Sequence, residues 1–315
     1  MIKIKRLANS IYFFSLILFA FSTIDSLAIN EPIFKKGKVI ISGHINRSIG
    51  SSKVVSVTYS QLAGRPTRLS LLLDSTGTFQ FEFDVLQAHD ATLWYEKGRA
   101  QLYIKPTDSL YVELDSDEFK KAKYPDFKIS GYGAGISTDI LKYHTFNALS
   151  NFQPSVENKS VSQYLSDIRK RIAKEDSVLS VFVKQYDPRE EFKYWARQDI
   201  VYRNANFLVD YEYYHSIHNT SFTGDLYDIR TFPVNDAQAA ASSWYQYHLW
   251  QYAQDKYVKA NKKIGALLKE DKEGNAYQLV LENILKGEVP GTGRDLICYQ
   301  SCFPFQRGLT LFIST

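Results

Sequence analysis

Cysteine is nearly absent from this chain of 315 residues, which contains only Cys298 and Cys302. The residues before Cys298 must hold their fold by core packing, because they have no thiols to cross-link. Three residues separate the two cysteines, whereas redox enzymes use Cys-x-x-Cys with the first thiolate at a helix N-terminus. We therefore predict a disulfide between Cys298 and Cys302 or two unlinked thiols, with redox catalysis as the less favoured alternative.

Catalytic and cofactor signatures are also missing. The sequence has no Gly-x-Ser-x-Gly, P-loop or dinucleotide fingerprint. The cluster Gly131-x-Gly133-x-Gly135 lacks the spacing of a nucleotide-binding loop, and we interpret it as a hinge. Glu212-x-x-His215 has the spacing found in di-metal helical bundles, but the second motif that such a site needs is absent. We predict no catalytic residue, no cofactor and no metal ligand.

Neither sign of charge dominates the chain. It has 38 Lys and Arg against 34 Asp and Glu, a formal net charge of +4, and residues 1–28 account for two of those charges. A nucleic-acid-binding protein needs a basic face, which the interleaved basic and acidic residues do not provide. We predict no nucleic-acid partner.

Long apolar runs are confined to the N-terminus, where residues 11–21 follow three basic side chains and precede Ser26-Leu27-Ala28. This order is typical of an export signal that is cut after a small residue. The run is shorter than the roughly 20 residues of a membrane-spanning helix, so we predict no stable membrane span after cleavage. We predict a signal peptide over 1–28 and an exported protein, with an uncleaved anchor as the alternative.

Aromatic residues, in contrast, are abundant: the chain has 22 Tyr, 20 Phe and 4 Trp. The densest run lies between Trp244 and Tyr252, and on a helix it would occupy more than one face. Most of these rings are expected to pack between elements, with a glycan- or peptide-binding surface as the alternative. The candidate residues for that surface are Trp244, Tyr247, Trp250 and Tyr252.

Residues 36–131 alternate between apolar and polar side chains with a period of two, most clearly from Phe79 to Val85. Short alternating runs divided by turn residues such as Asp74-Ser75-Thr76-Gly77 favour an antiparallel β-sandwich. A domain of this length with about seven strands is large enough for its own core. We therefore expect this segment to fold by itself.

The pattern becomes helical after the glycine cluster, which predicts an α+β protein with a helical domain over 136–287. Ser137 is expected to cap its first helix, Ser160 and Gln163 have capping-box spacing, and Gly287 suits a C-cap. The predicted helices cover about residues 137–152, 161–186, 192–208, 237–260 and 276–286. We predict a poorly structured tail over 288–315, because its apolar end carries no acidic residue after Asp295 and no cap.

Four short blocks carry a resemblance to a known family. They are Ser75-Thr76-Gly77-Thr78-Phe79, residues 105–112 (Lys-Pro-Thr-Asp-Ser-Leu-Tyr-Val), Ser130-Gly131-Tyr132-Gly133-Ala134 and Phe232-Pro233-Val234-Asn235. Over about residues 36–297 the chain resembles the N-terminal, non-catalytic region of TlpA-like thioredoxin-family proteins of the bacterial envelope. In that family a small β-sandwich and a helical segment precede a thioredoxin domain that performs the redox chemistry.

The chain departs from the family where the thioredoxin domain would begin, since no Trp-Cys-x-x-Cys occurs in it. The resemblance implies a periplasmic or envelope protein that lacks the redox domain and binds another envelope protein or a thioredoxin-like domain. The alternative is a stand-alone envelope protein that binds glycans or peptides through exposed aromatic residues. A working oxidoreductase is the least favoured hypothesis.

Overall fold

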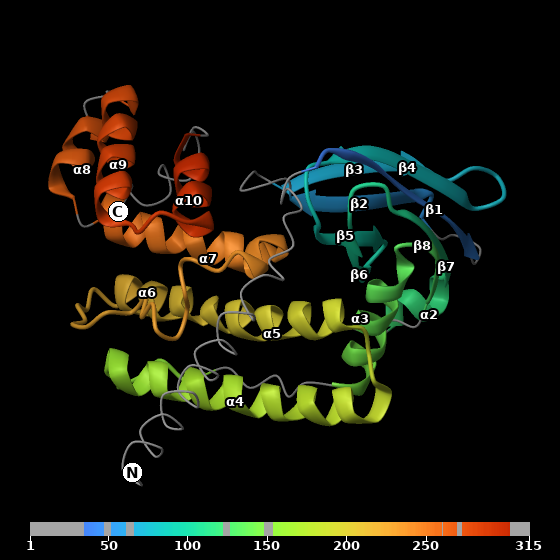
Figure 1. The fold of residues 1–315 in the computed structure, drawn as a ribbon, viewed down its shortest axis with the longest axis horizontal. Helices are drawn as coiled ribbons and strands as arrows, with labels where there is room; N and C mark the ends of the chain where they lie inside the picture. The colour runs from blue at the N-terminus through green and yellow to red at the C-terminus, as the bar shows by residue number, and fades with distance from the viewer. Residues whose placement is uncertain are drawn as a thin grey trace, which may run out of the picture. The chain divides into compact units, whose positions relative to one another are not determined.

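The computed structural model describes residues 35–46, 52–60, 66–121, 127–147, 154–259, 261–269 and 273–302. The predicted signal peptide, residues 1–28, lies outside these ranges, as do residues 303–315. The described residues from Lys36 onward belong to one compact unit. Strands come first and helices follow, which confirms the predicted α+β class (Figure 1).

The described residues form eight strands in two four-stranded sheets, with the strand orders β4-β1-β7-β8 and β3-β2-β5-β6. Every pairing between described strands is antiparallel except that of β1 with β7, which is parallel. The strands are β1 (Gly37–Asn46), β2 (Val54–Ser60), β3 (Pro66–Leu72), β4 (Thr78–Val85), β5 (His89–Tyr95), β6 (Gly98–Ile104), β7 (Ser109–Asp115) and β8 (Lys128–Tyr132).

The two sheets share one apolar core between them, as the alternating pattern predicts. On β4 the side chains of Phe79, Phe81 and Phe83 are buried, while the residues between them face outward. Phe83 stacks on Tyr59 of β2, with ring centroids 4.2 Å apart, and so links one sheet to the other. Burial of these rings removes large apolar areas from water, which stabilises the face-to-face packing of the sheets.

The glycine cluster forms the turn from the last strand into the first long helix. Gly131 and Gly133 have φ angles of +97° and +86°, a backbone region that favours glycine. A Cβ at Gly133 would lie 2.2 Å from the carboxyl group of Asp108, so a larger residue there would have to displace that group. The positive φ angles and this close approach explain why glycine occupies positions 131 and 133, so a nucleotide-binding role is not needed to account for them.

After the last strand, helices joined by loops make up the described chain (Figure 1). The α-helices are α2 (Ser116–Lys121), α3 (Ala134–Phe146), α4 (Val161–Tyr186), α5 (Glu190–Ala205), α6 (Phe207–Ile217), α7 (Ser243–Ala253), α8 (Lys262–Lys269), α9 (Glu273–Gly287) and α10 (Thr292–Cys302). A 3-10 helix, η1 (Gln238–Ala241), precedes α7, and a π-helix, η2 (Gln254–Lys259), follows it. No helix in the described part of the chain combines the length and the apolar character needed to cross a membrane.

Helix α4 begins and ends at the residues predicted from the sequence. The Ser160 hydroxyl accepts the Gln163 N–H and the Gln163 side chain accepts the Ser160 N–H, which confirms the capping box. The helix ends before Asp187, which has a positive φ and precedes Pro188. Figure 1 shows α4, α5 and α7 side by side, and α5 lies in contact with both α4 and α7.

Two predicted helices are interrupted. The one expected over 192–208 divides at Asn206 into α5 and α6. The one expected over 237–260 consists of η1, α7 and η2 in succession. Ser242 ends η1 in an extended conformation and then caps α7 by accepting the Tyr245 N–H, so one residue both stops and restarts the helix.

The prediction of a poorly structured tail over 288–315 is wrong for Thr292–Cys302, which form α10. Leu296 and Ile297 enter the helical core and are 2% and 0% exposed. The Oδ1 atom of Asn235 accepts the backbone N–H groups of Gly293 and Arg294, at 3.1 and 3.4 Å. The cap of α10 thus comes from a distant loop, which is why local sequence gave no sign of it.

Candidate binding site at the sandwich–helix junction

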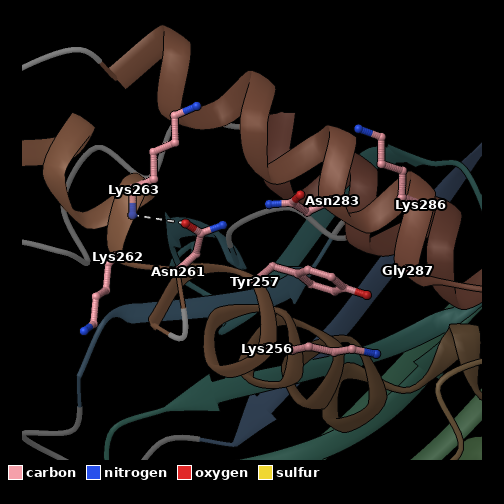
Figure 2. Close-up of a pocket in the computed structure, with 8 residues that line it drawn as sticks. All are labelled: Lys256, Tyr257, Asn261, Lys262, Lys263, Asn283, Lys286 and Gly287. Atoms are coloured by element: carbon pink, nitrogen blue, oxygen red, sulfur yellow. Dashed lines mark hydrogen bonds between the residues drawn. The ribbon is translucent and has the colours of Figure 1, made fainter.

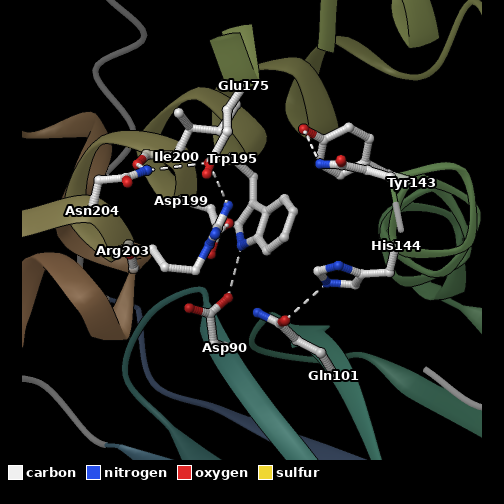
Figure 3. Close-up of polar contacts among 12 residues, drawn as sticks. Asp90, Gln101, Tyr143, His144, Glu175, Trp195, Asp199, Ile200, Arg203 and Asn204 are labelled. Carbon is white, nitrogen blue, oxygen red and sulfur yellow. Dashed lines mark hydrogen bonds and ion pairs between the residues drawn. The ribbon is translucent and has the colours of Figure 1, made fainter. Parts of the chain in front are cut away.

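A buried carboxylate joins the sandwich to the helices. Asp90 on β5 is 8% exposed and accepts the indole N–H of Trp195 on α5 at 2.8 Å (Figure 3). Its second oxygen accepts the backbone N–H and the hydroxyl of Ser243 on α7, each at 3.1 Å. Three donors from two helices therefore converge on one side chain of the sheet.

The environment of Asp90 disfavours its charge. Burial raises the pKa of the carboxyl group to about 6, against the opposing effect of the hydrogen bonds from Trp195 and Ser243. The nearby negative charge of Asp199 adds to the rise. Asp90 therefore changes its protonation state close to neutral pH, where ordinary aspartates are fully ionised.

Further polar contacts across the junction reach backbone atoms. The Ser137 hydroxyl on α3 donates to the carbonyl of Tyr103 on β6 at 3.1 Å. The same hydroxyl accepts the backbone N–H of Tyr103 at 2.9 Å. The prediction that Ser137 caps α3 is therefore wrong, because Gly133 occupies the N-cap position. On the other side, Gln87 donates to the Ala240 carbonyl of η1 at 3.1 Å. These bonds fix the backbones of the two halves relative to one another.

Deeper in the helical layers, a buried charge network holds α4 against α5 (Figure 3). Glu175 pairs with Arg171 and Arg203, each at 2.9 Å, and also accepts the Asn204 amide at 3.1 Å. Arg203 bridges in addition to Asp199, one turn earlier on α5. Removing one partner of such a buried pair leaves an uncompensated charge, so the network fixes the position of α5.

Beside these contacts lies a pocket of about 400 Å³, which we call the junction pocket. It opens between β6, α5 and η1, and its aromatic walls are Tyr103, Trp195 and Tyr194, of which Tyr194 is 49% exposed. The remaining lining residues are Glu190, Glu191, Gln198, Gln238, Ala241 and Ser242. Ligand sites favour such positions between structural units.

The lining of the junction pocket suits recognition better than catalysis. Glu190 is paired with Lys193 at 2.7 Å and Glu191 with Lys105 at 3.1 Å, so both carboxylates are partly neutralised. Burial raises the pKa of Tyr103 far above its usual range, which keeps the phenol neutral. Ring faces, two amides and paired carboxylates together can bind a ligand with both apolar and hydrogen-bonding parts.

The four aromatic residues singled out from the sequence all lie on α7, but they do not form one surface. Tyr247 is 38% exposed and stacks on the partly exposed Trp250, with centroids 5.9 Å apart. Trp244 packs partly against the helical core. Tyr252 is 4% exposed and donates its hydroxyl to Glu288 at 2.6 Å, so it lies in the core rather than on a binding surface. The exposed set is therefore the pair Tyr247 and Trp250.

Both cysteines lie on α10, where Cys298 is partly buried against the helical core. The side chain of Cys302 lies outside the described residues, so the expected disulfide or pair of unlinked thiols stays a prediction. In the Glu-x-x-His motif, Glu212 pairs with Lys259 at 2.7 Å and His215 contacts the Thr220 hydroxyl. Within the described ranges no three His, Cys, Asp or Glu side chains gather as they would around a metal ion.

Sequence reasoning missed the junction pocket. Asp90 and Trp195 are 105 positions apart, and no local pattern connects residues at that distance. A weak signal was present in His89-Asp90, two polar residues at the start of a strand whose other residues are mainly apolar. Buried polar groups need partners, so such a pair points to a contact outside the sandwich.

Comparisons of this chain with family models, with curated proteins and with solved structures give no match. The junction pocket is therefore identified by its geometry and its lining residues alone.

Proposed function

We propose that this protein is a non-catalytic, partner-binding protein of the bacterial envelope, and that it serves as the accessory part of a thioredoxin-like disulfide reductase system. The observation that carries the proposal is the junction pocket, a concave site with aromatic walls between two halves that are fixed to one another. The sequence resemblance over residues 36–297 and the predicted signal over 1–28 support the envelope and the thioredoxin-like system.

The chemistry of the pocket suits a segment of polypeptide. Tyr194 and Trp195 offer ring faces for an apolar side chain, and the amides of Gln198 and Gln238 can pair with a peptide backbone. The volume of about 400 Å³ falls within the usual range of ligand pockets, roughly 300–1,000 Å³. The natural partner in this proposal is a surface segment of a thioredoxin-like domain.

A photo-crosslinking amino acid placed at position 194 tests the proposal in cells of the host. Tyr194 is half exposed and lines the pocket, whereas Tyr213 on α6 is more exposed and lies outside it, which makes position 213 a matched control. We expect an adduct with a thioredoxin-like envelope protein from position 194 only. The same adducts from both positions, or none from position 194, would contradict the proposal.

A second candidate function is binding of glycans or peptides through exposed aromatic residues, favoured by the stacked pair Tyr247 and Trp250. The Tyr247 hydroxyl also accepts a hydrogen bond from the Gln251 amide at 2.6 Å, which holds the ring in place. Trp250→Ala should then weaken binding of envelope oligosaccharides by about tenfold, the effect of losing one stacking ring. Calorimetry with Trp244→Ala as control measures it, and equal binding by both variants would exclude this surface.

A further inference from the structure

A second concave site lies at the far end of the helical layers, and its lining is basic. This groove, which we call the lysine groove, has a volume of about 530 Å³ and lies between η2, α8 and α9 (Figure 2). Four of its lining side chains are Lys256, Lys262, Lys263 and Lys286, and two more are Asn261 and Asn283. None of the residues that line it is acidic.

Three of the four ammonium groups are available to a ligand. No ion pair within the described residues involves the side chain of Lys262 or Lys263, and both are exposed. Lys286 is 4.0 Å from Glu282, at the limit of an ion pair between exposed side chains. Such a contact contributes little and is readily exchanged for a better partner.

The fourth, Lys256, belongs to the wall of the groove. It donates to Glu288 at 2.8 Å, and Glu288 also accepts the hydroxyls of Tyr252 and Tyr257. Burial opposes ionisation of Glu288, but these donors outweigh it and lower the pKa of the carboxyl group. The π-helix that carries Lys256 and Tyr257 is a rare form, frequent at functional sites.

The backbone on the other side is held as well. Asn261 accepts the N–H groups of Lys263 and Ile264 at 3.1 and 3.3 Å and so fixes the start of α8 (Figure 2). In Figure 2, Lys263, Asn283 and Lys286 occupy the upper part of the view, and Tyr257 and Lys256 lie below them. Side chains with ammonium and amide groups, from three elements, therefore line the groove.

We propose that the lysine groove binds a phosphate monoester. Such a group carries close to two negative charges and three acceptor oxygens near neutral pH, which match several ammonium groups and the amide donors. The groove is open, so the monoester can belong to a soluble small molecule or to a lipid headgroup. The proposal is independent of the partner-binding function, because the groove and the junction pocket share no residue.

The test is the binding of two probes to the full mature chain at low ionic strength. The probes are inorganic phosphate, measured by calorimetry, and phosphatidylcholine vesicles with or without phosphatidic acid, measured by co-sedimentation. The variant replaces Lys262, Lys263 and Lys286 together by Gln. The control variant makes the same change in net charge with Lys97→Gln, Lys128→Gln and Lys174→Gln, which are exposed and lie outside the groove.

We expect the groove variant to bind phosphate about tenfold more weakly than the wild type, and the control variant to bind almost normally. If the wild type sediments only with vesicles that contain phosphatidic acid, and the groove variant does not, the phosphate belongs to a lipid headgroup. Saturable phosphate binding without sedimentation would assign it to a soluble molecule. Equal losses in both variants, or no saturable binding of either probe by the wild type, would overturn the proposal. Lys263→Gln alone, with a loss of about threefold, answers the same question should the triple variant fold poorly.

Discussion

Replacing Trp195 by Phe should destabilise the protein by more than the loss of ring size explains. The substitution removes the indole N–H that donates to the buried Asp90 at 2.8 Å. A hydrogen bond to a charged group contributes about 1.5–3 kcal/mol, and the smaller ring loses packing of about 1 kcal/mol. The expected decrease in the free energy of unfolding is therefore about 3 kcal/mol, a large part of a total of about 5–15 kcal/mol.

Trp94 provides the matched control for this measurement. Its indole nitrogen, on the same strand as Asp90, is buried and has no hydrogen-bond partner in the described structure. Trp94→Phe therefore loses packing but no hydrogen bond, and we expect a decrease of about 1 kcal/mol. Urea unfolding followed by circular dichroism measures both variants. Equal losses in the two variants would refute the idea that the Trp195 bond stabilises the junction.

The pH dependence of unfolding gives an independent measurement of Asp90. Its pKa is about 6 in the folded protein and about 3.9 in an unfolded chain, so the folded state holds an extra proton between those values. Stability from this group is greatest below about pH 4, falls as pH rises to about 6 and is constant above. The full effect is about 2–3 kcal/mol, since one pKa unit corresponds to about 1.4 kcal/mol.

Asp90→Asn should remove this step, so the difference in unfolding free energy between wild type and variant should change across that range. Trp195→Phe should move the step to higher pH, because the lost hydrogen bond favoured the charged form. A wild-type-minus-variant difference that does not vary with pH would show that the carboxyl group of Asp90 does not titrate as we infer.

Three further predictions concern the core, the cysteines and the N-terminus. Phe81→Asp in the full mature chain should abolish cooperative unfolding, because Phe81 is 4% exposed in the sandwich core and an unpaired charge there costs several kcal/mol; thermal melting followed by circular dichroism checks it. Wild type and Cys298→Ser should both lack turnover in insulin reduction, and turnover that disappears with the serine would restore the oxidoreductase hypothesis. Mass spectrometry of the exported protein should find Ile29 as the first residue, whereas an intact Met1 on a membrane-bound product would disprove cleavage.

The features that could be predicted from the sequence are those that neighbouring residues determine. The alternation from Phe79 to Val85 places one face of β4 in the core because strand side chains alternate strictly. The capping box of Ser160 and Gln163 sets the start of α4 through contacts three residues apart. Both features therefore occur in the structure as the sequence predicts.

The features that could not be predicted depend on contacts between distant segments. Asn235 caps α10 from 58 positions away, and Trp195 reaches Asp90 across 105. The burial of Tyr252 depends on distant partners such as Glu288, information that a helical period does not contain. The candidate site was missed for the same reason, since the junction pocket combines β6, α5 and η1.

The parallel pairing of β1 with β7 has a consequence for the order of events during synthesis. Strand β1 lies inside its sheet, with β4 on one side and β7, which ends at Asp115, on the other. A nascent chain that stops short of Ser109 can pair β1 with β4 but leaves its other edge open, with unpaired N–H and C=O groups. Pairings of such large sequence separation also form slowly. We therefore expect the newly made chain to be aggregation-prone until β7 has emerged, and a chaperone to cover the open edge of β1 during that time.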